Sequence, residues 1–411
     1  MLTALRRGSA AVSSQGLSTA QNLLVSFTTA AIATPAQYGA WGIGFALFLA
    51  FQSVVRAAVS TPQLLAAGTA GREADSAQGP AAITASILAG MASSVVMCSA
   101  AAAVPPTVAP VLIAFALSLV PAFAHDASRY LAISENHYQR LIVLDASRLG
   151  LQTAATGALF LTGHASTMSL TLAWGISALG PLLWQALTLR DLFSLTAARR
   201  FYGPIWRDCV KMAGEASIGT AGANGVPIVV GATLGLTSAG YFRAGMTAMG
   251  LINVFVAGLI PVVTKTVKHQ VSSGGDDANV LRQWSVALAA VTLLYSAALW
   301  MIPPQLGSLL LGDSWAGFRG ALLGFALQGA ARGPFMYVPI SLRAREQFNA
   351  ALRLRIETSV LQVLLPCAGG YLFGFEGAVW GYAAAAAINS LQALPAWLRS
   401  RRTTGQTPAG S

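Results

Sequence analysis

Arginine side chains inside long apolar segments are the groups of this sequence best able to do chemistry. Arg56, Arg243 and Arg332 each lie within such a segment, and Arg243 has no acidic residue three or four positions away. A cation at the centre of a bilayer costs about 3 kcal/mol unless it is paired, hydrated or near an end. A planar guanidinium group binds phosphate oxygens in pairs. We therefore predict that the three arginines line an aqueous cavity and bind an anionic substrate, with contact to lipid headgroups as the alternative for Arg56.

Uncharged polar residues supply a second, weaker set of predicted substrate contacts. Gln21 and Asn22 lie midway along the first apolar segment, where they either meet substrate or hydrogen-bond between helices. The run Asn224-Gly225-Val226-Pro227 predicts a bend, because proline removes a backbone donor and clashes with the preceding turn. This bend is either a moving gate, with Asn224 facing the substrate, or a static kink. Glu215 is predicted either as a protonatable coupling group or as the partner of Lys211, four positions earlier.

Acidic residues in the apolar segments are few, and they lie toward one predicted side of the membrane. Asp145 and Arg148 are three positions apart on one predicted helix, so we expect them to pair with each other. Arg353 and Glu357 are four positions apart and are expected to pair in the same way. No carboxylate is predicted at mid-membrane depth, which argues against an exporter of small cations.

Groups that could support catalysis or bind a metal are scattered. The three cysteines show no CxxC spacing, and the four histidines form no cluster. The connections predicted to face outward contain only Asp313, Glu376 and His164 for acid–base or metal chemistry, each in a different connection. We therefore predict no enzymatic activity, no catalytic residue, no metal site and no cofactor.

Composition identifies the elements that must position these side chains. The chain is 55% hydrophobic and 9% charged, whereas soluble domains contain roughly 25% charged residues. An apolar helix of about 20 residues crosses the roughly 30 Å hydrocarbon core of a bilayer. Such segments predict twelve membrane spans, at 10–33, 39–60, 81–104, 108–130, 141–161, 166–189, 211–234, 239–263, 283–302, 318–340, 354–373 and 377–398.

The Lys and Arg residues of the connections alternate with the spans: they occur in the connections after even-numbered spans and not in those after odd-numbered spans. The net charge is +11, yet no Lys or Arg occurs in the connections after odd-numbered spans. Cationic connections stay on the cytoplasmic side during insertion, so both termini are predicted to be cytoplasmic. This placement explains the charge by topology and by contact with membrane lipids, and we predict no nucleic-acid partner.

The twelve spans divide into two sets of six. We predict an all-α polytopic membrane protein with about 12 transmembrane helices in two six-helix lobes around a central cavity. The predicted lobes are residues 1–195 and 206–402, joined by a cytoplasmic linker at 196–205 and followed by a disordered tail at 403–411. The GxxxG pair Gly377 and Gly381 is predicted to pack helices closely.

Several short motifs resemble those of polysaccharide flippases, the O-antigen and exopolysaccharide exporters of the multidrug/oligosaccharidyl-lipid/polysaccharide superfamily. The resemblance is carried by LGLTSAGYFRA at 234–244, GLIP at 258–261, LLLGDSW at 309–315, GFEGAVWG at 374–381 and AQYGAW at 36–41.

The resemblance implies twelve helices in two lobes and alternating access, with movement of polyprenyl-diphosphate-linked sugars from the inner to the outer leaflet. Related lipid II flippases place cavity arginines on helices one, two and eight. Arg56 falls near the helix-two position and Arg243 about one turn early on helix eight, whereas the first span carries Gln21 and Asn22 in place of a charge. This departure favours the polysaccharide branch.

We therefore predict a flippase or exporter of a lipid-linked oligosaccharide in the cytoplasmic membrane, with a glycan polymerase or glycosyltransferases as possible partners. Two alternatives remain open. One is a small-molecule exporter of the multidrug type with the same fold. The other is a membrane glycan polymerase or ligase, which would require a large charged outer connection, whereas the longest one here is 303–317.

Overall fold

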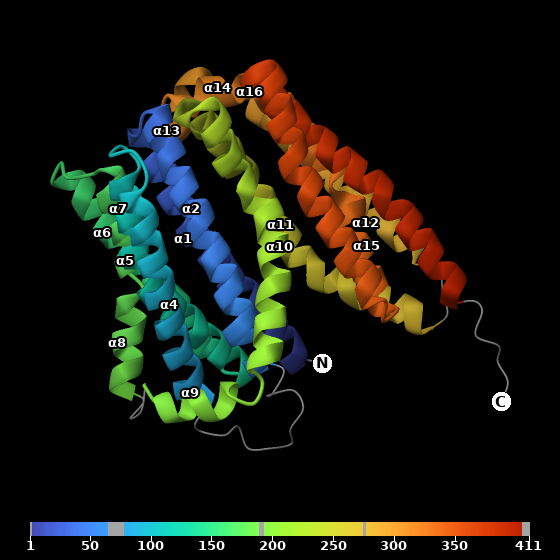
Figure 1. Cartoon of the computed structure of the whole chain (residues 1–411), viewed down its shortest axis with the longest axis horizontal. Coiled ribbons are helices and arrows are strands. Elements are labelled where there is room, and N and C mark those ends of the chain that lie inside the picture. Colours follow the sequence, from blue (N-terminus) through green and yellow to red (C-terminus); the bar gives the residue numbers. More distant parts are fainter. Residues whose placement is uncertain (1, 65–77, 189–192, 274–276, 405–411) are drawn as a thin grey trace. The chain divides into compact units, whose positions relative to one another are not determined.

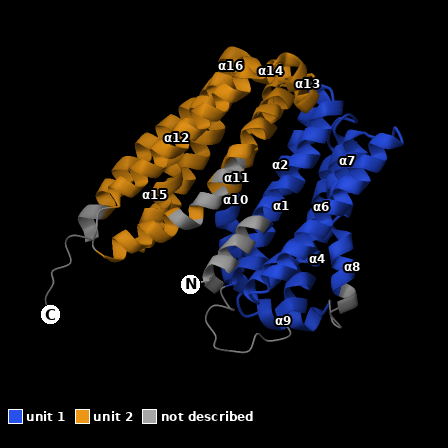
Figure 2. Cartoon of the chain, turned by 180° about the vertical axis from the view of Figure 1, so that it is seen from behind, with its two compact units in different colours: residues 1–217 blue, residues 218–411 orange. Residues whose placement is uncertain are grey.

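A computed structural model describes residues 2–64, 78–188, 193–273 and 277–404, and the regular elements within these ranges are all helices (Figure 1). The chain forms two compact units, residues 1–217 and 218–411 (Figure 2). Of the predicted tail, residues 405–411 lie outside the described residues, and residues 403–404 belong to the last helix.

The described residues of the first unit form a series of helices that ends with the start of α10. They are α1 (Leu2–Ile32), α2 (Pro35–Val55), the π-helix η1 (Arg56–Ser60), α4 (Gln78–Ala102), α5 (Ala109–Ser134), α6 (Tyr138–Leu161), α7 (Thr167–Ile176), α8 (Leu179–Thr188), α9 (Leu195–Tyr202) and the first part of α10 (Trp206–Leu234).

The second unit begins within α10. Its further helices are α11 (Leu236–Ser272), α12 (Ala278–Met301), α13 (Pro304–Leu311), α14 (Ser314–Ala331), α15 (Gly333–Ala344) and α16 (Phe348–Thr404). The long helix α16 breaks at Phe373 and Gly374, where Gly374 has a φ of 66°.

The predicted all-α membrane fold is confirmed, with some spans divided differently. The predicted sixth span is split into α7 and α8, and the tenth into α14 and α15, while the eleventh and twelfth are the two arms of α16. Six described helices are long and apolar enough to cross a membrane, or seven if the bent helix α10 counts as one span. The bend in α10 measures 51° between Gly222 and Asn224, close to the predicted position.

The core of the first unit is built around α5, the most buried of its long apolar helices. Helix α5 packs against α4, α2 and α7, and α1 packs against α6. Aromatic rings from three helices fill the centre. The ring centres of Phe48 in α2 and Trp174 in α7 are 4.7 Å apart, and the Phe115 ring of α5 packs against both. Rings of this size bury large apolar areas and hold the helices in one arrangement.

A capping box begins α2. The Thr34 hydroxyl accepts a hydrogen bond from the backbone N–H of Gln37, whose side chain accepts one from the N–H of Thr34. We expect Thr34→Ala to lower the free energy of unfolding by about 1 kcal/mol, because a backbone donor loses its acceptor. Thermal unfolding in detergent would measure the loss. The control Thr34→Ser keeps the acceptor, so equal stability of the two variants would contradict this prediction.

The core of the second unit joins α11, α14 and α16. Phe325 of α14 lies 5.2 Å from Phe242 of α11 and 6.5 Å from Tyr382 of α16. The two arms of α16 run antiparallel, and the Asn389 side chain of the second arm donates to the Thr358 carbonyl of the first at 3.1 Å. Helix α10 meets the first arm through small residues, since Gly222 lies against the backbone of Ser359.

Candidate functional site: a buried charge network in the first unit

Charged side chains face one another across α5 and α6 inside the first unit. His125, Asp126 and Arg129 lie on one side of α5, and Asp145 and Arg148 lie on α6. All five are buried, with at most 8% of each residue exposed. Asp126 is eight residues from the end of α5 and Asp145 is seven from the start of α6, or about 10–12 Å at 1.5 Å per residue. Burial at this depth is the arrangement that membrane proteins reserve for functional or tightly paired groups.

Arg56 extends the network to η1, where the α2 helix widens into a π-helical turn. Its Nε and Nη2 atoms donate to the two carboxylate oxygens of Asp126 at 2.9 and 2.7 Å. The same guanidinium lies 5.5 Å from the ring of Tyr130. Its side chain keeps 37% of its surface exposed, so the network opens at this edge. π-helical turns often occur at functional sites.

Asp145 connects α1, α5 and α6. Its carboxylate accepts a hydrogen bond of 2.5 Å from the Ser14 hydroxyl and forms a 2.8 Å ion pair with Nε of Arg129. Arg129 also donates to the Ser14 oxygen at 3.3 Å and lies 3.5 Å from Asp126. Arg129 therefore lies between the two carboxylates.

The hydrogen bonds of His125 indicate a neutral ring. Its Nδ1 lies 3.4 Å from Nη1 of Arg148, which can only donate, so Nδ1 must accept. Its Nε2 lies 3.5 Å from the Leu144 carbonyl and is then the donor. Arg148 also donates to the Trp174 carbonyl at 3.5 Å and lies 5.5 Å from the centre of the Trp174 ring.

Gln21 joins α1 to the network through the backbone. Its side-chain nitrogen donates to the Asp145 carbonyl at 2.9 Å, and Gln152 donates to the Gln21 carbonyl at the same distance. These bonds correspond to the interhelical alternative for Gln21. Asn22 is half-buried beside it.

The network carries a net positive charge. Three guanidinium groups, on Arg56, Arg129 and Arg148, face two carboxylates, on Asp126 and Asp145, so these described residues sum to +1 with His125 neutral. Each carboxylate already has an arginine partner. A buried site of this composition favours a nearby anion over a cation, because a further positive charge would add to an existing surplus.

The remaining predicted site residues lie outside this network. Arg243 is buried in the second unit, and Arg332 lies at the junction of α14 and α15, where it interacts electrostatically with Tyr337 and Tyr382. Asn224 is half-buried next to the bend of α10, and Glu215 is exposed on α10 in the first unit. The structure therefore brings together Gln21 and Arg56, but does not place the other predicted residues in the same site.

Two of the predicted ion pairs have different outcomes. Arg353 and Glu357 pair at 2.8 Å, as predicted. The expected pair of Asp145 with Arg148 is wrong, because Arg129 and Ser14 occupy the Asp145 carboxylate and Arg148 turns toward Trp174.

A second buried carboxylate site lies in the second unit. Asp277, which precedes α12, is fully buried and accepts hydrogen bonds from Ser341 and from Arg345 at 2.9 Å. The indole N–H of Trp397 lies 3.3 Å from one of its oxygens. This residue joins α12, α15 and the second arm of α16. No sequence pattern pointed to it, since Asp277 lies in the predicted connection before the span at 283–302.

Metal-ligating side chains do not gather in the part of the chain that the structure describes. No group of three or more His, Cys, Asp or Glu residues there could hold a metal ion. The buried histidine that is present, His125, is surrounded by guanidinium groups, which would repel a cation.

The chain is similar to known proteins in its three-dimensional structure, but not in its sequence. No protein-family profile matches the chain, and no curated protein sequence matches it. Among solved structures, the chain is similar to the inward-facing conformation of a multidrug resistance MATE family transporter of the MOP superfamily, with 14% identity, 96% coverage of each chain and a TM-score of 0.76.

Two further structures support the same fold. The outward-facing conformation of a multidrug resistance MATE family transporter is 13% identical over 98% of this chain and 96% of that one, with a TM-score of 0.65. The Vibrio cholerae MATE transporter VcmN in the bent form is 13% identical over 98% of this chain and 97% of that one, with a TM-score of 0.56. At these identities the likeness establishes the fold, with its two sets of six helices, along nearly the whole chain.

Proposed function

We propose that the chain is an exporter of small molecules that works by alternating access in a membrane. The observation that carries this proposal is the match over nearly the entire chain to transporters solved in both inward-facing and outward-facing conformations. The two compact helical units are consistent with it, because transporters of this kind move one helix bundle against the other.

The charge of the network narrows the proposed substrate class. The described residues around Asp126 and Asp145 carry a surplus of one positive charge, and both carboxylates are bound by arginines. A binding site for a cation would need a carboxylate available to it. We therefore infer that the preferred substrates are anionic or carry a phosphate.

A polyprenyl-diphosphate-linked oligosaccharide is the second candidate substrate. It is favoured by the same arginine surplus and by the sequence motifs at 234–244 and 374–381. Under this proposal Arg56, Arg243 and Arg332 bind the diphosphate, with Gln21, Asn22 and Asn224 as further contacts and Glu215 as the coupling carboxylate. The partners would be membrane lipids and a glycan polymerase or glycosyltransferases.

Both candidates place the chain in the cytoplasmic membrane with both termini inside, on the evidence of its cationic connections. The lobes are proposed to be residues 1–195 and 206–402, with 196–205 as the linker between them. Neither candidate requires a metal or a cofactor.

Efflux measurements distinguish the candidates. Cells that lack their other exporters would be loaded with an anionic dye, carboxyfluorescein, or a cationic dye, ethidium, with and without the chain. We expect faster efflux of carboxyfluorescein only. Preferential efflux of ethidium would overturn the inferred substrate charge. Unchanged efflux of both dyes, with lipid-linked glycan accumulating in a deletion strain, would replace the first candidate by the second.

Arg243 provides a test of substrate contact. If its guanidinium binds the anionic group, Arg243→Ala should slow transport about tenfold to a hundredfold, because a hydrogen bond to a charged group contributes about 1.5–3 kcal/mol. Arg243→Lys should keep part of the activity, since it keeps the charge but loses the planar fork. The exposed Arg353 supplies the control Arg353→Gln. Transport by Arg243→Ala equal to that of the control, at equal protein level, would exclude the role.

A further inference from the structure

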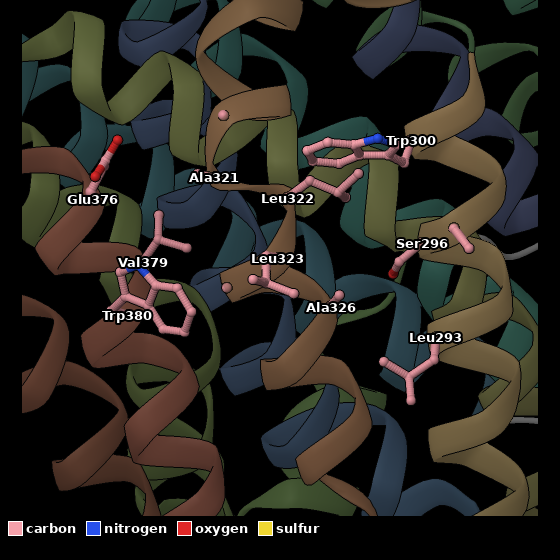
Figure 3. Close-up of a pocket in the computed structure, with 13 residues that line it drawn as sticks. Leu293, Ser296, Trp300, Ala321, Leu322, Leu323, Ala326, Glu376, Val379 and Trp380 are labelled. Carbon is pink, nitrogen blue, oxygen red and sulfur yellow. The ribbon is translucent and has the colours of Figure 1, made fainter.

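A groove in the second unit lies between α12, α14 and the second arm of α16, and its residues all belong to this unit. Its volume is about 490 Å³. Aliphatic side chains line its length, among them Leu293, Leu323 and Val379 (Figure 3). Leu293 and Leu323 are 46% and 55% exposed, so the groove is open along its side. An apolar groove of this kind in a membrane protein can accept an acyl chain.

One end of the groove differs from the rest because it carries polar and aromatic groups. Trp300 and Glu376 lie on opposite sides of that end, above the aliphatic residues (Figure 3). The two tryptophans of the groove, Trp300 and Trp380, are 56% and 48% exposed. Tryptophan prefers the level of the lipid headgroups, where its ring is apolar and its N–H reaches water.

A cation lies on the Trp300 side of this end. Arg319 precedes Gly320, a residue that lines the groove, and its guanidinium lies 5.8 Å from the Trp300 ring. Its Nη2 donates to the Trp300 carbonyl at 3.4 Å. These contacts hold the charge beside the ring while the remaining donors stay available to a phosphate. Arg319 lies next to a connection without other cations, so topology does not explain it.

We propose that this groove binds one phospholipid whose headgroup carries both a phosphate and a primary ammonium. The acyl chain lies against Leu293, Leu323 and Val379, the phosphate meets Arg319, and the ammonium donates to the Glu376 carboxylate. The argument is charge complementarity: one cation and one anion flank the headgroup end, and the aliphatic wall begins below them. This inference does not depend on which substrate is transported.

The charges of Arg319 and Glu376 favour phosphatidylethanolamine over other phospholipids. A phospholipid with a net negative headgroup would satisfy Arg319 but would meet repulsion from Glu376. A choline headgroup has no N–H to donate to the carboxylate, so it loses a charge-assisted hydrogen bond. The expected order of retention is therefore phosphatidylethanolamine before phosphatidylcholine and phosphatidylglycerol.

Lipid retention tests the proposal on the full-length protein. The chain would be reconstituted in vesicles with equal amounts of the three lipids, extracted in mild detergent, and its retained lipid identified by mass spectrometry. Leu323→Trp fills the groove and should remove most of the retained phosphatidylethanolamine. The control Leu294→Trp changes a leucine of α12 that is 72% exposed and does not line the groove, and it should retain the lipid.

Two charge variants test the headgroup contacts. Arg319→Gln should reduce retention of all three phospholipids, and Glu376→Gln should remove the preference for phosphatidylethanolamine over phosphatidylglycerol. Equal retention by Leu323→Trp and Leu294→Trp would overturn the groove as the site. Preferential retention of phosphatidylglycerol by the wild-type chain would overturn the assignment of the ammonium to Glu376.

Discussion

Replacement of Asp145 by asparagine is expected to lower the free energy of unfolding by about 3–5 kcal/mol, the usual cost of removing one partner from a buried ion pair. Asp145 is fully buried, and its carboxylate forms an ion pair with Arg129 at 2.8 Å. Asparagine keeps the shape of the side chain but removes its charge. Arg129 would then share only Asp126, which Arg56 already holds in a bidentate pair.

The measurement is chemical or thermal unfolding of the purified full-length protein in detergent. Asp208→Asn is the matched control, because Asp208 also pairs with a cation, Lys211, but its side chain is 66% exposed. Exposed ion pairs contribute about 0–1 kcal/mol, so the control should be nearly as stable as the wild type. Equal stability of Asp145→Asn and Asp208→Asn would show that the network contributes little to folding.

A double replacement separates the charge from the packing. Arg129→Met together with Asp145→Leu removes both charges of the pair and puts an apolar side chain of comparable length at each position. Replacing a whole buried ion pair by apolar residues is often neutral or stabilising, so the double variant should recover most of the loss. If the double variant is stable but transports no substrate, the charges are retained for transport. If it unfolds as readily as Asp145→Asn, the loss of stability does not come from an unpaired Arg129 charge.

The sequence predicted those features that depend on neighbouring residues. Length and hydropathy located the helices, because each span must satisfy its own backbone hydrogen bonds in lipid. The break in α16 falls at the end of the predicted span 354–373, and Gly374 has the positive φ that glycine tolerates best. The pair of Arg353 with Glu357 was predicted because both lie on one turn of one helix.

The charge network was beyond this kind of reasoning, since its partners come from different helices. Arg56 and Asp126 are 70 positions apart, and Ser14 and Asp145 are 131 apart. The spacing within α6 predicted an ion pair of Asp145 with Arg148. The packing of α5 against α6 instead brings Arg129 of α5 into an ion pair with Asp145. For the same reason Arg129 and Asp277 were not among the predicted site residues. Ion pairs within one helix can be predicted from spacing, whereas pairs between helices require the packing of the unit.

A second large loss of stability is expected from substitution of Gly377, because the two arms of α16 meet there through their backbones. A Cβ atom at this position would lie 2.1 Å from the carbonyl oxygen of Gly369, and one at Gly381 would lie 2.2 Å from that of Leu365. A backbone oxygen cannot rotate away as a side chain can, so the arms must separate. We expect Gly377→Val to lower the free energy of unfolding by about 3 kcal/mol or more.

Gly157 of α6 provides the matched control for this substitution. It also lies inside a helix, but a Cβ there would meet no atom within 4 Å. Gly157→Ala should leave stability unchanged or raise it by up to about 1 kcal/mol, because alanine favours the helix. A loss of stability in Gly377→Val without a loss in Gly157→Ala, in the same unfolding assay, would show that close approach of the arms, and not glycine content as such, stabilises this hairpin. A loss of stability in both variants, or in neither, would contradict it.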